Sequence, residues 1–126
     1  MLDGPLWMFR FVYEYILNGD TSWGHDPMPV IRNVSVPVLW VVAGKDLEAP
    51  PQGTLDALKL LQAEGRDVAY AVFEDTDHGM VEFEEGPEGR EVTRYAEGYF
   101  AMVADWIRDG SFQRAYGQAQ LHPSPQ

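Results

Sequence analysis

Residues Val36 to Pro50 read VPVLWVVAGKDLEAP and give the strongest indication of the fold. Its apolar run is continuous and rich in β-branched residues, which is typical of a strand buried on both faces of a parallel sheet. The run ends at a glycine, after which come a carboxylate, Asp46, and a proline. A second apolar run, DVAYAVF from Asp67 to Phe73, is followed by EDTDHGM, which contains His78. The sequence therefore predicts two strands, each followed by a residue capable of acid–base chemistry.

The residues between the two runs, Pro51 to Glu64, predict a helix with proline at its start and a glycine at its end. A strand, a helix of this length and a second strand predict a parallel, right-handed βαβ unit. Apolar residues at helical spacing predict two further helices, Pro5 to Leu17 and Val92 to Ile107. We therefore predict the α/β class: a βαβα core with two parallel strands, plus an N-terminal helix.

Residues 1–110 are predicted to form one domain, because 126 residues offer no basis for two separate cores. Residues 111–126 are polar and contain prolines and glutamines, which predicts a flexible tail. Gly79 to Thr93 carries many glutamates and is predicted to be a solvated loop.

The composition excludes several classes of function. The net charge of −11 disfavours nucleic acids and anionic membrane surfaces as partners. The absence of cysteine excludes disulfides, thiolate metal sites and cysteine nucleophiles. No apolar run approaches the roughly 20 residues of a membrane span, and the first residues lack the features of a signal peptide. A cytoplasmic protein that binds no membrane is therefore expected.

Asp46 and His78 are the candidate catalytic residues. Side chains just beyond the carboxyl ends of parallel strands face one crevice, so a carboxylate and an imidazole can meet there. A carboxylate fixes the tautomer of the imidazole and stabilises its protonated form, as a general base requires. The other histidines, His25 and His122, are interpreted as surface residues. No cofactor site is predicted, and no metal site, because Asp75 and Asp77 are interpreted as turn residues and the sequence offers no third ligand.

At these residues the chain resembles the carboxyl-terminal portion of the α/β hydrolases, in the serine esterase and prolyl-oligopeptidase-like group. The resemblance spans roughly residues 20–108 and includes Pro37-Val-Leu-Trp-Val-Val-Ala-Gly-Lys-Asp-Leu-Glu-Ala-Pro50 and Val72-Phe-Glu-Asp-Thr-Asp-His-Gly-Met80. It implies that Asp46 is the acid of a catalytic triad and His78 its base. Many members have one more residue between the glycine and the acid, so Glu48 is the alternative acid.

The resemblance lacks the nucleophile. In the family a serine on a G-x-S-x-G turn precedes the acid and the histidine, and this chain has no such pentapeptide. Ser22 lies nearest to a glycine-flanked pattern, but its spacing differs and no apolar strand precedes it. The resemblance thus implies a C-terminal fragment of a serine hydrolase, inactive alone, that acts on a small acyl substrate: a carboxylic ester first, a peptide or amide second. The alternative is a non-catalytic assembly or binding module that retains hydrolase geometry.

Such a fragment would leave elements exposed that normally pack against the rest of the domain. Two kinds of partner are therefore predicted. Two parallel strands that are apolar on both faces leave open edges, which are sites for pairing. A homodimer is predicted, formed through the edge of Val38 to Ala43 or through an apolar helix face. The other predicted partner is the missing N-terminal half of a hydrolase, which would supply the serine.

Overall fold

The computed structural model describes residues 26–126. The predicted helix Pro5 to Leu17, Ser22 and His25 lie outside the described residues. The chain divides into two units, with the boundary after Val34. The described part of the first unit contains a short helix, α2 (Met28–Arg32), whose first turn is preceded by Asp26, the side chain of which accepts the backbone N–H of Met28.

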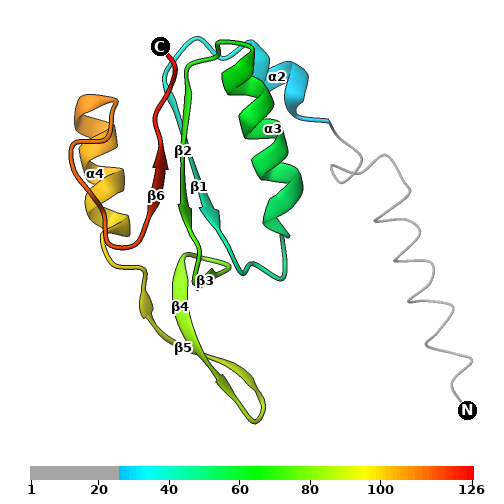
Figure 1. The fold of residues 1–126 in the computed structure, drawn as a ribbon, viewed down its shortest axis with the longest axis vertical. Helices are drawn as coiled ribbons and strands as arrows, with labels where there is room; N and C mark the ends of the chain where they lie inside the picture. Colours follow the sequence, from blue (N-terminus) through cyan, green and yellow to red (C-terminus); the bar gives the residue numbers. More distant parts are fainter. Residues whose placement is uncertain (1–25) are drawn as a thin grey trace, which may run out of the picture. The chain divides into compact units, whose positions relative to one another are not determined.

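The second unit contains a three-stranded sheet in the order β1-β2-β6 (Figure 1). Strands β1 (Val38–Ala43) and β2 (Val68–Phe73) are parallel and are connected by helix α3 (Pro51–Ala63). All six residues of β2 are buried, which explains why its sequence is apolar without alternation. The third strand, β6 (Gln120–His122), is antiparallel to β2. The sheet is therefore mixed.

A second three-stranded sheet, in the order β3-β4-β5, follows β2. It consists of β3 (Thr76–Asp77), β4 (Val81–Gly86) and β5 (Gly89–Tyr95), and its pairings are antiparallel. The last helix, α4 (Tyr99–Asp109), comes after this sheet. Figure 1 shows α3 and α4 on opposite sides of the first sheet, with the β4–β5 hairpin extending from the end of β2.

The predicted βαβα core with an N-terminal helix is wrong as the description of this fold, because the described residues form two small sheets, one mixed and one antiparallel, with three short helices. The glutamate-rich segment from Gly79 to Thr93 is a hairpin and not a solvated loop. Two of its glutamates are paired with arginines across the strands, Glu82 with Arg94 and Glu85 with Arg90, while Glu84 lies opposite Glu91. Cross-strand pairs of opposite charge stabilise a hairpin in a way that residue counts do not reveal.

Residues 111–126, predicted to be a flexible tail, are held by specific contacts. Strand β6 pairs with β2, and the ring of His122 stacks on Tyr70 with their centroids 4.2 Å apart. The side-chain amide of Gln62 donates hydrogen bonds to the main-chain oxygens of Val68 and Pro123. This segment is part of the folded unit, and the side chains of Arg114 and Tyr116 bind the buried carboxylate of Asp105.

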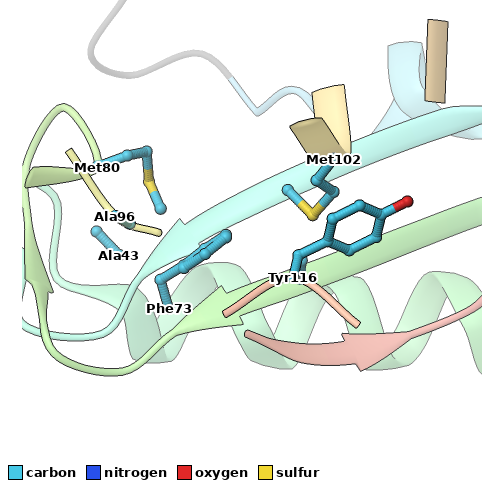
Figure 2. Close-up of a cluster of buried hydrophobic side chains, with 7 residues drawn as sticks. Ala43, Phe73, Met80, Ala96, Met102 and Tyr116 are labelled. Carbon is cyan, nitrogen blue, oxygen red and sulfur yellow. The ribbon is translucent and has the colours of Figure 1, made fainter. Parts of the chain in front are cut away.

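The main core lies between the first sheet, α4 and the turn that follows β3. Figure 2 shows Phe73 at the end of β2 between Met80 on one side and Met102 and Tyr116 on the other. Seven buried residues make up this cluster: Ala43, Ala71, Phe73, Met80, Ala96, Met102 and Tyr116. The ends of β1 and β2, which precede the candidate residues, are therefore anchored in the core.

None of the helices within residues 26–126 is long and apolar enough to cross a lipid bilayer.

Candidate functional site

The loops that follow β1 and β2 lie against each other. The backbone N–H of Gly44 donates to Phe73, the last residue of β2, and the N–H of Lys45 donates to Thr76. A Cβ atom on Gly44 would collide with the main-chain oxygen of Glu74. Glycine is thus required at this position for the two loops to approach so closely.

The turn after β3 orients His78. Gly79 and Met80 both have positive φ angles, 79° and 62°, and Met80 is not a glycine, so this conformation is strained. The reversal sends the Met80 side chain into the core, where Figure 2 shows it above Phe73. The Met80 carbonyl accepts the backbone N–H of Ala96. Burial of Met80 therefore compensates for the strained turn that places His78 at the surface beside the first loop.

The structure brings Asp46 and His78 together. Nδ1 of His78 lies 2.9 Å from Oδ2 of Asp46. An ionised carboxylate only accepts hydrogen bonds, so the proton of the neutral ring is on Nδ1 and the lone pair is on Nε2. The His78 side chain is 54% exposed and that of Asp46 only 11%. The ring is thus held at Nδ1, and about half of its side-chain surface is exposed to solvent.

Asp46 is fixed by its own loop. Its Oδ1 atom accepts the backbone N–H groups of Glu48 at 2.8 Å and Ala49 at 2.9 Å. Partial burial raises the pKa of the Asp46 carboxyl, but the hydrogen bonds from Ala49, His78 and Glu48 outweigh it, so the pKa is below its ordinary value. Asp46 is therefore ionised at neutral pH and available to hold an imidazolium.

Two further carboxylates lie around His78. The hydrogen bond and the charge of Asp46 raise the pKa of His78 most, followed by the charge of Glu48, whose Oε2 lies 3.6 Å from Nε2 of His78. That distance is too long for a hydrogen bond but supports an ion pair when the ring is protonated. Asp77 accepts the backbone N–H of His78 through Oδ1 at 2.7 Å. Of the two possible acids named from the sequence, Asp46 is the one bonded to the ring, and Glu48 lies on its exposed side.

The remaining sequence candidates are not part of this arrangement. Within residues 26–126, no serine hydroxyl is hydrogen-bonded to the His78 ring; Ser111 and Ser124 bond to nearby glutamines. His122 stacks on Tyr70, as described above. Over the same residues, no group of three histidines or carboxylates is arranged to hold a metal ion. Asp77 was interpreted from the sequence as a turn residue only, and its bond to His78 depends on the strained turn that follows.

A small pocket of about 190 Å³ adjoins Asp46, and His78 is not part of its lining. Its walls come from β1, from the loop that carries Asp46 and from the first turn of α3. Its lining includes Trp40, Val42, Ala49 and Pro51. The lining is largely apolar, which suits an uncharged group better than a charged one.

No protein-family model, curated protein or solved structure matches this chain.

Proposed function

We propose that Asp46 and His78 are the acid and the base of a serine hydrolase whose nucleophile is supplied by another polypeptide or by a part of a longer enzyme outside this chain. The observation that carries this proposal is the 2.9 Å hydrogen bond between Nδ1 of His78 and Oδ2 of Asp46, on a ring whose side chain is 54% exposed and whose Nε2 makes no hydrogen bond to the described residues. A carboxylate on Nδ1 and an open Nε2 are what a serine hydroxyl needs from its base.

The chemistry would follow from the roles of the two ring nitrogens. As the serine oxygen attacks the carbonyl carbon of an ester, Nε2 of His78 takes the hydroxyl proton and Asp46 stays ionised beside Nδ1. The leaving alcohol takes that proton when the acyl–oxygen bond breaks. Water then attacks the acyl-serine with the same base, which releases the carboxylic acid and regenerates the serine. Carboxylic esters are the preferred substrate class, with peptides or amides second.

The outer edge of β1 supports docking of the part that carries the nucleophile. The N–H groups of Val38 and Gly44 point towards β2 and are bonded there. Because successive residues of a strand alternate, the N–H groups of Leu39, Val41 and Ala43 point outwards. Among residues 26–126, no strand pairs with this edge. A strand added there would lie directly beside the loop of Asp46.

Labelling with a fluorophosphonate, which reacts with activated serines, tests the proposal. We expect little labelling or p-nitrophenyl ester hydrolysis by the chain alone. We expect labelling of the nucleophile in the polypeptide encoded immediately upstream once it is added. His78→Ala should abolish that labelling, whereas His122→Ala should not, because His122 is remote from the acid loop. Labelling that survives His78→Ala would overturn the proposal, as would the lack of any activated serine in the mixture.

A second candidate function, a non-catalytic assembly module, is favoured by the same edge. Trp40 is 38% exposed and Val36 is exposed next to the outward N–H groups of β1. We propose a second copy of the chain as the partner, paired edge to edge about a two-fold axis. Size-exclusion chromatography with light scattering should then show a dimer, and Val41→Pro should convert it to a monomer, because it removes an outward donor without breaking the ladder to β2. A wild-type chain that is monomeric at high concentration would exclude this function.

A further inference from the structure

Arg90, near the start of β5, contacts both loops of the candidate site. Its Nη1 atom donates a hydrogen bond of 2.6 Å to the main-chain oxygen of Lys45. The same nitrogen lies 3.0 Å from Oδ2 of Asp77, and Nε lies 3.3 Å from Oε1 of Glu85. The side chains of Arg90 and Asp77 are only 19% and 22% exposed, so their ion pair is sheltered from solvent more than ordinary surface ion pairs are, whereas Glu85 is 70% exposed.

The two loop partners of Arg90 are the immediate neighbours of the two candidate residues. Lys45 precedes Asp46, and Asp77 precedes His78. Asp77 also accepts the backbone N–H of His78 through its second oxygen. The Arg90 guanidinium therefore binds the main chain next to Asp46. It also binds Asp77, whose carboxylate accepts the backbone N–H of His78.

The guanidinium is itself held in place by the hairpin. It lies over the ring of Phe83, 4.1 Å from the ring centroid, and Phe83 belongs to the neighbouring strand β4. Glu85, the cross-strand partner of Arg90, bonds to Nε. Stacking on an aromatic ring and bonding to several acceptors suit the planar guanidinium, and a lysine ammonium matches this geometry poorly.

We propose that Arg90 is a positioning residue for the Asp46–His78 pair, through which the β4–β5 hairpin holds the two loops at hydrogen-bond distance. It contacts neither side chain of the pair and acts through Lys45 and Asp77. The catalytic consequence rests on the proposed hydrolase function, but the positioning does not, because the pair is present in the chain by itself.

The direction in which the pKa of His78 changes when Arg90 is replaced distinguishes a positioning role of Arg90 from a purely electrostatic one. Removing a cation near His78 raises the pKa of His78 through charge alone, since a nearby positive charge disfavours the imidazolium. If Arg90 instead keeps Asp46 within reach of the ring, losing it weakens the largest cause of the raised pKa, and the pKa of His78 falls. Other charges that face the ring, from Asp46, Glu48 and Asp77, are unchanged by the substitution.

The experiment is an NMR titration of the His78 ring in the full chain, with Arg90→Lys and Arg90→Ala compared with wild type. Arg90→Lys keeps the charge, so a fall in the pKa of His78 in this variant reports positioning alone, and we expect one. We expect a fall in Arg90→Ala as well. Arg94→Ala is the matched control, because Arg94 lies on the same strand and pairs with Glu82; it should leave the pKa unchanged.

The Asp46→Asn background provides the second control. There the Arg90→Lys substitution should no longer lower the pKa of His78, since the carboxylate to be positioned is gone. A rise or no change in the pKa of His78 in Arg90→Ala and Arg90→Lys would overturn the proposal, as would an equal fall in Arg94→Ala. The titration needs neither nucleophile nor substrate, so failure of the hydrolase proposal leaves its outcome interpretable.

Discussion

Asp46 and Asp105 are both largely buried carboxylates that accept several hydrogen bonds, but their partners differ in kind. Asp105, in α4, accepts from Arg108, from both Nε and Nη2 of Arg114, and from the hydroxyl of Tyr116, at 2.8–3.0 Å. Asp46 accepts from two backbone N–H groups and from one titratable ring. Asp105 therefore has only partners that stay protonated at neutral pH, whereas His78 can gain and lose its proton.

The partners of these two side chains distinguish a structural carboxylate from a candidate catalytic one. The hydrogen bond from Tyr116 lowers the pKa of Asp105 most; burial opposes this, and Arg114 and Arg108 add to the lowering. The pKa of Asp46 is lowered too, so a lowered pKa alone does not separate the two. What separates them is the kind of partner: Arg108 and Arg114 are as exposed as His78, but only the imidazole of His78 can lose its proton near neutral pH.

Asp105→Asn should give the largest effect on stability. The amide places a donor among the donors of Arg114 and Tyr116, and a buried hydroxyl loses its acceptor. We expect the Tm to fall by roughly 10 °C or more. Asp109→Asn is the matched control, because Asp109 pairs with Arg108 at the surface; its Tm should change by about 2 °C or less. Equal melting temperatures for the two variants would show that the buried cluster does not hold α4 to the C-terminal segment.

Tyr116→Phe should give the next largest loss. The tyrosine hydroxyl donates to Asp105 and accepts the backbone N–H of Gln113, and phenylalanine keeps the buried ring. We expect the free energy of unfolding to fall by about 1.5–3 kcal/mol, the range for a hydrogen bond to a charged group. Urea denaturation measures this. Tyr95→Phe, which alters an exposed tyrosine, should change it by less than about 0.5 kcal/mol; a similar loss in both would argue against a specific bond at Asp105.

Asp46→Asn should change titration more than stability. Asparagine still accepts the N–H groups of Glu48 and Ala49 but cannot hold an imidazolium, so the pKa of His78 should fall towards its ordinary value of 6.5. NMR titration of the ring measures this change. Asp75→Asn is the control, because Asp75 pairs with Lys45 and not with His78. An unchanged pKa of His78 in Asp46→Asn would show that another group raises it.

Asp46→Asn should also change how the stability of the fold depends on pH. The raised pKa of His78 stabilises the fold fully below about pH 6.5, and this stabilisation is lost as the pH rises through the folded pKa. The lowered pKa of Asp46 stabilises the fold above about pH 3.8, and this is lost as the pH falls through the folded pKa. The Tm difference between wild type and Asp46→Asn should therefore be greatest between these two values. A difference that does not vary with pH would contradict the coupling of the two groups.

The adjacency of Asp46 and His78 could be predicted because it depends on local signals. Two apolar runs of strand length, each followed by a glycine-containing turn, indicate where their carboxyl ends lie. The structure pairs Val38 to Ala43 with Val68 to Phe73 residue by residue, so the two loops emerge side by side. The nucleophile could not be placed, because the sequence offers no motif for it.

The fold class was mispredicted where structure depends on pairing between distant polar residues. Residues 81–95 are rich in glutamate, and only the cross-strand arginines make a hairpin of them. The signal that could have indicated it is Gly86 and Gly89 flanking a two-residue turn, with alternating Val81 and Phe83. Likewise, the ring of Tyr116 is buried in the core cluster and its hydroxyl bonds to Asp105, and a composition of prolines and glutamines gives no hint of these contacts.

The helix predicted from Val92 begins only at Tyr99 in the structure, again because of a contact between residues that are distant in the sequence. Gly98 has a φ of 81°, and a Cβ atom there would lie 2.8 Å from the main chain of Tyr116. The chain cannot continue a helix through such a residue, so β5 ends at Tyr95 and α4 starts at Tyr99. Tyr95, Tyr99 and Met102 fit one apolar helical spacing, but Tyr95 belongs to β5 and the other two belong to α4. Periodicity alone therefore does not mark the boundary between the strand and the helix.

Glu48→Gln should give the smallest effect and decides which carboxylate serves the ring. Glu48 is 74% exposed, and its carboxylate lies 3.6 Å from Nε2 of His78 without a hydrogen bond. We expect a fall in the pKa of His78 smaller than in Asp46→Asn, with no measurable change in Tm. Because exposed charges are screened, about 1 M NaCl should remove most of the difference between Glu48→Gln and wild type and leave that of Asp46→Asn largely intact. If Glu48→Gln instead lowers the pKa as much as Asp46→Asn, Glu48 is the acid of the pair and Asp46 only shapes the loop.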